Sequence, residues 1–505
     1  MVARCIMVQG TGSDVGKSVI TAGLCRLMLR KGLRVAPFKS QNMALNSFIT
    51  RDGGEIGRAQ AVQAEAARVE ATVDMNPVLL KPNQDNNSQL IIHGKAIRNM
   101  TAKAYFAEQE LPFKAIKESL TRLKREWELV ILEGAGSPAE INLRDYDLVN
   151  MKIAELAQAP VLLVANIDKG GVFASIVGTL ELLNPVERDR IKGLIINKFR
   201  GDPARFERGK ELIEKYTALP VIGVIPYFED FYIPEEDSLP SREQGSKNYQ
   251  IDIAVVYLPH ISNFTDFDPL RYEPGVRIRY IKDVTQLGTT DLLIIPGSKN
   301  TIEDLQYLTQ SGFVNEIRER SRQGIPVLGI CGGFQMLGKR ISDPWQLESK
   351  QGFIQGIGLL ELETVLEREK ITRQVKAEII SDISFLAGLK GQMISGYEIH
   401  QGRSILKSPS SPLFKVYPGG KDNQQIFDGL ASADGLILGS YLHGLFDNDH
   451  LRRTFVNCLR ERKGLNPLPE GFLSVWTERE KAYNQLADLL EANLKMELLT
   501  DIIFS

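Results

Sequence analysis

Cysteine is scarce in this chain, with 4 among 505 residues, and the thiols are scattered without a CxxC pair. A disulfide framework of the secreted type is therefore excluded, and a reducing compartment is expected. The first ten residues hold an arginine and an apolar run too short for a signal peptide. No run approaches the ~20 apolar residues of a membrane span. We expect a cytoplasmic protein with no membrane partner.

An excess of charge of either sign is also missing. The 61 basic and 63 acidic residues give a net charge of −2, so no overall field attracts a polyanion and no nucleic-acid partner is expected. With 43% hydrophobic and 25% charged residues, the composition is that of a folded globular protein. The length predicts about three domains, and the oligomeric state stays open.

Short apolar runs bounded by glycine or proline predict buried parallel strands in both halves. Their alternation with segments of helical spacing predicts α/β domains, the first a doubly wound parallel sheet. We expect domains over 1–235 and 250–450, a polar linker over 236–249 and a helical C-terminal extension over 451–505. The charged run Leu366–Lys370 is interpreted as a solvated face. The clearest expected strands are Cys5–Val8, Val35–Phe38, Leu129–Leu132, Val161–Ala165, Leu194–Ile196, Val221–Ile225, Ile251–Leu258, Leu292–Pro296 and Val327–Ile330, and the C-terminal helix is expected from Leu486, Leu489, Leu490 and Leu494.

A glycine-rich turn, GTGSDVGKS, follows the first expected strand and leads directly into a helical segment. Backbone N–H groups of such a loop point at phosphate oxygens, Lys17 neutralises them and Ser18 can ligate Mg²⁺. The usual first glycine of this motif is Thr11 here, and Gly10 lies one residue further out. The pattern predicts a site for ATP and Mg²⁺, with candidate nucleotide-binding residues Thr11, Gly12, Ser13, Asp14, Val15, Gly16, Lys17 and Ser18.

Polar residues at the ends of neighbouring strands complete this prediction, because open α/β sheets bind ligands at the carboxyl ends of their strands. Glu133 ends one expected strand and is the candidate second magnesium ligand, or a solvated acid. Lys39, followed by Gln41 and Asn42, can hold a phosphate or an anionic substrate, or form an ordinary loop. Asn197 can read an adenine edge or cap a helix.

The second half carries a candidate nucleophile. The strand Val327–Ile330 runs into Cys331, which glycines flank on both sides and a helical segment follows; this is the layout of a nucleophile elbow. A buried structural cysteine is the alternative. His443 is the best candidate base and His400 is its rival. The N–H groups of Gly297 and Gly332 are the candidate oxyanion hole.

Several long motifs, in the same order along the chain, resemble one family. The second half looks like a class I glutamine amidotransferase domain of the type fused to cobalamin-pathway synthetases. The first half is similar to dethiobiotin-synthetase-like P-loop ligases. Together they resemble the cobyric acid synthase family. The motifs are Pro37–Ala44, Ile261–Asp268, Pro296–Thr301, the Gly-Ile-Cys331-Gly-Gly elbow, Gly396–His400 and Tyr441–Gly444.

The resemblance implies the ATP- and glutamine-dependent amidation of the b, d, e and g carboxylates of adenosylcobyrinic acid a,c-diamide. It maps the family's cysteine and histidine onto Cys331 and His443. Wider class I amidotransferases have a glutamate two residues after this histidine, where the chain has Leu445. Either Glu398 orients His443 or the site is a Cys–His dyad. The alternatives are a cobyrinic acid a,c-diamide synthase, or a partitioning-type P-loop ATPase with an inert amidotransferase-like half.

Overall fold

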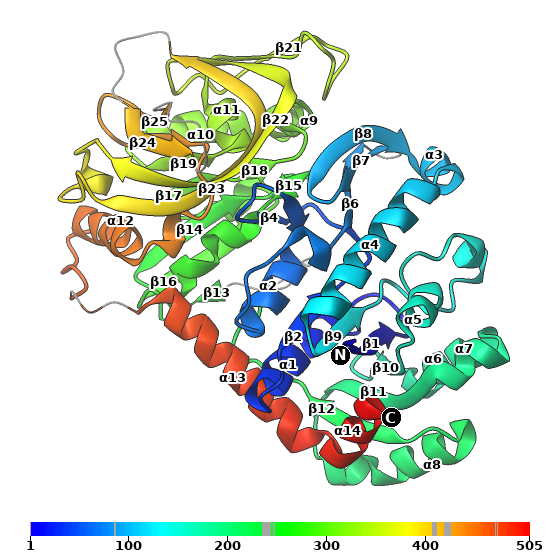
Figure 1. Cartoon of the computed structure of the whole chain (residues 1–505). Coiled ribbons are helices and arrows are strands. Elements are labelled where there is room, and N and C mark those ends of the chain that lie inside the picture. The colour runs from blue at the N-terminus through cyan, green and yellow to red at the C-terminus, as the bar shows by residue number, and fades with distance from the viewer. Residues whose placement is uncertain are drawn as a thin grey trace.

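The computed structural model describes residues 2–84, 87–234, 244–245, 248–406, 412–418, 426–469, 471 and 473–505. Figure 1 shows two α/β bodies side by side, with the C-terminal helices returning from the second body to the first. This confirms the predicted fold class. The linker expected over 236–249 lies largely outside the described residues. Among the residues described, no helix is both long and apolar enough to cross a bilayer.

The first body is built on a six-stranded, fully parallel sheet in the order β12-β11-β10-β1-β9-β2. Helices cover both faces, which is why its strands are continuous apolar runs. Strands β1, β9 and β10 lie together, so their carboxyl ends meet where the glycine-rich loop leaves β1. The elements are β1 (Arg4–Gly10), β2 (Val35–Phe38), β9 (Leu129–Glu133), β10 (Val161–Asn166), β11 (Ile191–Phe199) and β12 (Val221–Pro226), with α1 (Lys17–Arg30), α2 (Arg58–Ala66), α4 (Glu110–Glu126), α5 (Met151–Ala157), α6 (Val172–Leu182), α7 (Pro185–Arg190) and α8 (Glu207–Thr217).

A small four-stranded sheet, in the order β3-β6-β7-β8, projects from the first body toward the second. The hairpin of β4 and β5 lies between this sheet and the second body (Figure 1). None of these short strands was predicted, because they lack the long apolar runs of the main sheet. The elements are β3 (Gln41–Met43), β4 (Ser47–Ile49), β5 (Glu55–Gly57), β6 (Val78–Gln84), β7 (Asn87–Ile92), β8 (Lys95–Thr101) and α3 (Ala102–Ala107).

The second body has a mixed sheet whose parallel part, β16-β14-β17-β19-β26, continues into antiparallel strands. The candidate nucleophile follows β19, which lies between β17 and β26. The elements are β14 (Ile251–Val256), β16 (Val276–Ile281), β17 (Leu292–Ile295), β19 (Val327–Ile330), β22 (Leu362–Ile379), β23 (Met393–Leu406), β24 (Pro412–Pro418), β25 (Ile426–Ala431) and β26 (Ile437–Ser440), the short β13 (Gln244–Gly245), β15 (Ile261–Ser262), β18 (Gly297–Ser298), β20 (Arg340–Ser342) and β21 (Phe353–Gln355), and α9 (Thr301–Gln310), α10 (Phe313–Arg322), α11 (Gly332–Leu337) and α12 (Asp449–Arg462).

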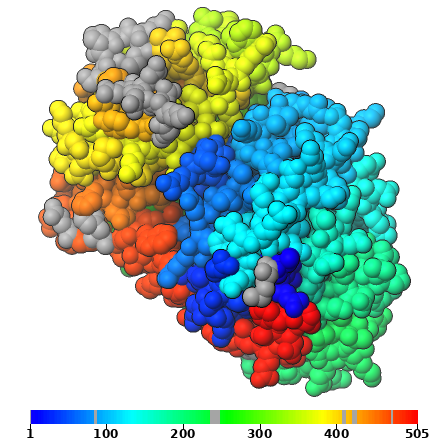
Figure 2. Space-filling model, viewed as in Figure 1, coloured from blue at the N-terminus to red at the C-terminus, as the bar shows by residue number. Residues whose placement is uncertain are grey.

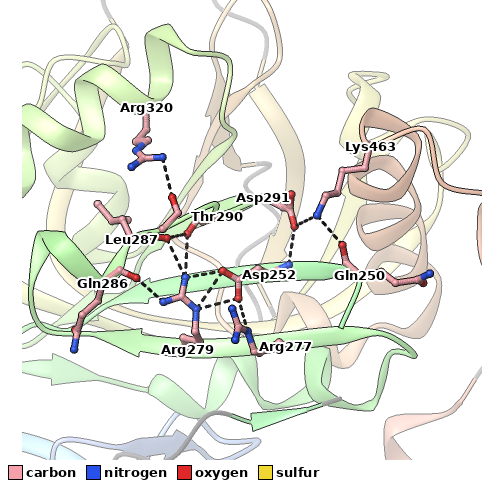
Figure 3. A network of polar contacts seen from close by, with 11 residues as sticks. Gln250, Asp252, Arg277, Arg279, Gln286, Leu287, Thr290, Asp291, Arg320 and Lys463 are labelled. Carbon is pink, nitrogen blue, oxygen red and sulfur yellow. Dashed lines mark hydrogen bonds and ion pairs between the residues drawn. The ribbon is translucent and has the colours of Figure 1, made fainter. Parts of the chain in front are cut away.

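An ionic network pins the amino ends of the parallel strands (Figure 3). The buried Asp252 carboxylate of β14 accepts hydrogen bonds from Arg277 at 2.8 Å and Arg279 at 2.6 Å, both on β16. Asp291 accepts from Lys463 at 2.8 Å, which ties α12 to the same end of the sheet. Because Cys331 lies at the opposite, carboxyl end of the strands, this network has a structural role.

The C-terminal helices α13 (Val475–Asn493) and α14 (Met496–Phe504) pack against the first body. Figure 2 shows this segment in red beside the blue N-terminal elements. Gly23 of α1 makes room for it, since a Cβ there would lie 2.4 Å from a methyl carbon of Leu490. Arg26 of α1, also buried, pairs with Glu480 at 2.6 Å. The C-terminal helix expected from the spacing of the leucines is therefore present. It docks on α1, which lies more than 450 residues earlier in the sequence.

Candidate active sites

The glycine-rich loop forms the floor of a cavity of about 340 Å³ at the carboxyl end of the first sheet. Gly16 adopts a left-handed conformation, with φ of 96°, immediately before α1. Lys17 Nζ donates to the carbonyls of Gly12 at 2.8 Å and Gly136 at 3.1 Å, so its ammonium group lies over the loop. Ser13, Asp14 and Ser18 line the same cavity. The loop has the form that binds phosphate at a helix N-terminus.

Glu133 lies at the centre of this site. Its Oε1 accepts hydrogen bonds from Ser18 Oγ at 2.7 Å and Lys39 Nζ at 3.0 Å, and its other oxygen accepts from Gln63. Burial opposes ionisation of Glu133, but the charge of Lys39 and these hydrogen bonds hold its pKa below the usual value. A buried, ionised carboxylate therefore stands beside the serine hydroxyl, as the sequence predicted.

The other residues expected at this site divide into two groups. Asn42 lines the cavity with Lys39, whereas Gln41 faces a neighbouring cavity, where its side-chain oxygen accepts from Tyr105. Asn197 Nδ2 donates to the backbone oxygen of Val15 at 2.8 Å, so it holds the loop and does not line the cavity. Three of the expected loop residues, Thr11, Gly12 and Val15, likewise shape the loop without lining the cavity.

Cys331 occupies a strained turn between β19 and α11. Its φ of 51° and ψ of −107° fall outside the regions that a non-glycine residue favours. The flanking glycines make the turn possible, since a Cβ on Gly333 would lie 1.9 Å from the backbone oxygen of Ile295. Cys331 Sγ lies 3.4 Å from the backbone oxygen of Ile399, and Cys331 lines a pocket. The predicted nucleophile elbow is therefore present.

His443 lies beside Cys331, and its acidic partner is Asp266. The Nδ1 atom is 2.6 Å from Asp266 Oδ2, and the ring stacks on Tyr397 at a centroid distance of 5.0 Å. Burial alone would lower the pKa of His443, but the charge of the Asp266 carboxylate and its hydrogen bond with the ring, together with the nearby Cys331, raise it to about 10. The imidazolium form is therefore favoured at neutral pH, and it stabilises negative charge on a neighbouring sulfur.

The sequence-based alternatives for orienting His443 were both wrong. Glu398 pairs instead with Arg373 and lies 3.6 Å from His400 Nε2. His400, the rival base, lines the pocket of Cys331, but its Nδ1–H donates to the backbone oxygen of Gly402 at 2.8 Å. Asp266 is 177 residues before His443. Its only sequence signal was its place in the motif Ile261–Asp268.

We predict that Asp266→Asn lowers glutaminase kcat/KM by about 10²- to 10⁴-fold, because the amide can no longer stabilise the imidazolium. Removing the carboxylate lowers the pKa of His443. The part of the pH–activity profile that follows deprotonation of His443 therefore moves to lower pH. Profiles of kcat/KM against pH test this shift. Glu398→Gln keeps the Asp266–His443 pair and is the control. An equal shift in both variants would contradict the assignment.

The candidate oxyanion hole lies where two loops converge. The Gly297–Ser298 backbone is strand β18, which pairs with β15. A Cβ on Gly332 would lie 2.9 Å from Ser298 N, and one on Gly297 would lie 3.4 Å from His443 Cε1. Both predicted glycines therefore lie next to the Cys331–His443 pair, and the amide nitrogen of Ser298, which was not among the predicted donors, lies close to Gly332.

An interdomain ion cluster borders the pocket of Cys331. Lys81, on β6 of the first body, and Lys370, on β22 of the second, both line this pocket. The buried Glu55 carboxylate accepts from Lys81 at 2.8 Å and from Lys370 at 2.5 Å. Burial opposes its ionisation, but the two ammonium groups hold the pKa of Glu55 well below its usual range. Lys370 is therefore not part of a solvated face, and that interpretation of Leu366–Lys370 was wrong for this residue.

The small sheet connects the two candidate sites. Strand β3 carries Asn42 and Met43, which line the nucleotide cavity, and it pairs with β6 so that Met43 lies opposite Leu80. The next residue of β6 is Lys81, which lines the pocket of Cys331. One pair of strands thus spans the distance between the two pockets.

A P-loop body and a second body with a Cys–His–Asp site at a nucleophile elbow define a glutamine amidotransferase joined to a nucleotide-binding domain. Comparison with known families supports both parts. Residues 6–240 match the CobQ/CobB/MinD/ParA nucleotide binding domain, and residues 252–451 match the CobB/CobQ-like glutamine amidotransferase domain.

Curated relatives match over almost the full chain. The cobyric acid synthase of Desulforamulus reducens is 50% identical over 98% of this chain and 97% of its own. That of Dehalococcoides mccartyi strain CBDB1 is 47% identical over 99% of both chains. The probable cobyric acid synthase of Methanothermobacter thermautotrophicus is 49% identical over 100% of both. The chain belongs to the cobyric acid synthase family and is a glutamine-hydrolysing ligase.

Proposed function

We propose that this chain amidates the b, d, e and g carboxylates of adenosylcobyrinic acid a,c-diamide, with ATP and glutamine, to give adenosylcobyric acid. The observation that carries the proposal is the pair of sites in one chain: a Cys–His–Asp group and a P-loop with a buried carboxylate. Their relatives along the full length are cobyric acid synthases. A partitioning-type ATPase with an inert second half is not retained, because the second half has a complete set of catalytic groups.

In the glutaminase half, Cys331 Sγ attacks the side-chain amide carbon of glutamine. The oxyanion forms beside the backbone of Gly297, Ser298 and Gly332, which offers N–H donors. His443 gives its proton to the leaving nitrogen, and ammonia departs as the thioester forms. Water, deprotonated by His443, then attacks the thioester and releases glutamate and the thiolate. Asp266 holds the ring in the required tautomer throughout.

Charged groups in the pocket suit the zwitterionic end of glutamine. Lys299 and Glu348 both line the pocket of Cys331. Burial lowers the pKa of Lys299 to about 7 and raises that of Glu348 to about 7. A bound α-carboxylate and α-ammonium would restore the charged forms of both side chains. We assign these two residues to the main-chain end of glutamine.

In the ligase half, a substrate carboxylate oxygen attacks the γ-phosphorus of ATP, and ADP leaves. Lys17 neutralises the phosphate oxygens. Ammonia then attacks the acyl carbon, loses a proton, and phosphate leaves as the amide forms. Activation is needed because a free carboxylate resists attack by ammonia.

The donor set fits a magnesium ion. Ser18 Oγ and Glu133 Oε1 converge at 2.7 Å, and the hard oxygen ligands of one hydroxyl and one carboxylate, with phosphates and water, are what Mg²⁺ prefers. Bound there, Mg²⁺ would offset negative charge on the β- and γ-phosphates. With Mg²⁺ held by Ser18 and Glu133, Lys39 would be available to bind a phosphate or carboxylate oxygen.

The placement of the two pockets suits direct delivery of ammonia. Free ammonia is mostly protonated at neutral pH and is then no nucleophile, so release into water wastes it. Strands β3 and β6 line one pocket each and pair with one another. Ammonia that moves along this sheet from the glutaminase pocket to the nucleotide cavity would stay out of bulk water.

The substrate is tested by incubating the enzyme with ATP, Mg²⁺ and glutamine and either unamidated cobyrinic acid or the adenosylated a,c-diamide. Mass spectrometry then counts the new amides. We expect turnover of the a,c-diamide through to cobyric acid. Turnover of cobyrinic acid alone would identify a cobyrinic acid a,c-diamide synthase and overturn the proposal.

A further inference from the structure

We propose that a cavity of about 820 Å³ beside the nucleotide site holds the corrin macrocycle during amidation. This inference rests on the function proposed above and adds the location of the substrate. The cavity lies between the loop after β9, helix α3 and the segments around α5 and α7. We call it the macrocycle cavity; its walls include Tyr105, Phe106, Leu143, Arg144, Tyr146 and Arg190.

The macrocycle cavity adjoins the nucleotide cavity. Met43, Ala135 and Gly136 line both of them. The carbonyl of Gly136 also accepts the hydrogen bond from Lys17 Nζ at 3.1 Å. A carboxylate on a short arm that passes Ala135 and Gly136 therefore arrives at the phosphate-binding lysine. Attack on a γ-phosphate requires such an approach of the carboxylate to the phosphate-binding loop.

One wall of the macrocycle cavity exposes apolar side chains to solvent. The short 3₁₀ segment Ile141–Tyr146 buries none of its side chains, and Leu143 and Tyr146 are 41% and 44% exposed. Phe106 packs against Tyr146 with ring centroids 4.9 Å apart. Exposed aromatic and aliphatic side chains at the mouth of a cavity indicate a ligand with a broad apolar face. The conjugated face of a corrin ring has this property.

The rim of the macrocycle cavity carries groups for the substituents of the ring. Lys152 and Arg190 supply positive charge that can pair with carboxylate arms, whereas Arg144 donates to the backbone oxygen of Leu182 and lies 3.8 Å from Glu187. Asp147 and Glu187, which also line the cavity, are engaged in capping helix N-termini: Asp147 accepts from the backbone of Asn150 at 2.7 Å and Glu187 from that of Asn184 at 3.0 Å. Glu140 and Glu155 are the other two acidic residues that line the cavity. Their carboxylates can accept hydrogen bonds from the amide groups of the substrate's side arms.

A wide, one-sided cavity also fits the repeated reaction. Each carboxylate arm of one macrocycle must reach the same γ-phosphate in turn, so the ring has to turn or rebind between rounds. The side chains of Phe106, Leu143 and Tyr146 permit this because their contacts with a ring face are apolar and not directional. The directional contacts lie on the rim, where they meet whichever arms point outward.

The test is a double variant, Leu143→Ala with Tyr146→Ala, compared with Leu212→Ala with Tyr216→Ala. The second pair removes the same two residue types from an exposed part of α8, where Leu212 and Tyr216 are 57% and 73% exposed. We expect the first variant to raise the Kd and KM for adenosylcobyrinic acid a,c-diamide about tenfold or more. ATP affinity and glutaminase kcat/KM should stay within twofold of wild type, as they should in the control.

The outcomes separate the location from the function. Wild-type turnover of the a,c-diamide together with an unchanged Kd in Leu143→Ala/Tyr146→Ala would overturn the location alone. Loss of affinity that the α8 control shares would also overturn it. Failure of the wild type to bind or amidate any corrinoid would instead overturn the proposed function. Because all four side chains are exposed, folding is expected to survive and is checked by thermal unfolding.

Discussion

Cys331→Ser is expected to lower both glutaminase activity and glutamine-dependent amidation by about four orders of magnitude or more. Amidation with ammonia in place of glutamine should continue. A serine hydroxyl beside His443 is a far weaker nucleophile than the sulfur of Cys331. The ligase site holds its own groups, Lys17 and Glu133, and they do not depend on the thiol. Glutamate release and corrinoid amidation are measured separately, with glutamine or with ammonium chloride.

Cys458→Ser is the matched control, since Cys458 is also a buried thiol of the second body but lies on α12. It should retain glutamine use. Loss of both glutamine- and ammonia-dependent activity in folded Cys331→Ser would contradict the division of labour between the two halves. Retention of glutaminase activity would remove Cys331 from the role of nucleophile.

The parallel strands and the two loops that follow them could be predicted from local sequence. A buried parallel strand is an apolar run, and a phosphate loop or a nucleophile elbow is a run of glycines with one reactive residue, so each signal is contained in about ten neighbouring residues. Glu133 and Cys331 lie at such strand ends, and Lys17 and Ser18 begin the helix after the phosphate loop. The structure has them where the pattern indicated.

Contacts between distant segments could not be predicted in the same way. Asp266 reaches His443 across 177 residues, and Lys370 reaches Glu55 across 315. Neither pair shares a local pattern, and Lys370 stands in a charged run typical of a surface. Asn197 shows the same limit, because an asparagine at a strand end has the same local signal whether it meets a base or a loop carbonyl. Only the packing of the loop against β11 decides between these.

Lys17→Ala is expected to lower amidation by about 10²- to 10³-fold or more, with glutamine and with ammonia alike. Its ammonium group lies over the loop, bonded to Gly12 and Gly136, and in the alanine variant no charge there neutralises the γ-phosphate. Basal glutaminase activity should remain, because the thiol site is intact. Lys31→Ala, at the exposed end of the same helix, should leave both activities unchanged. Normal amidation in folded Lys17→Ala would show that carboxylate activation does not take place at this loop.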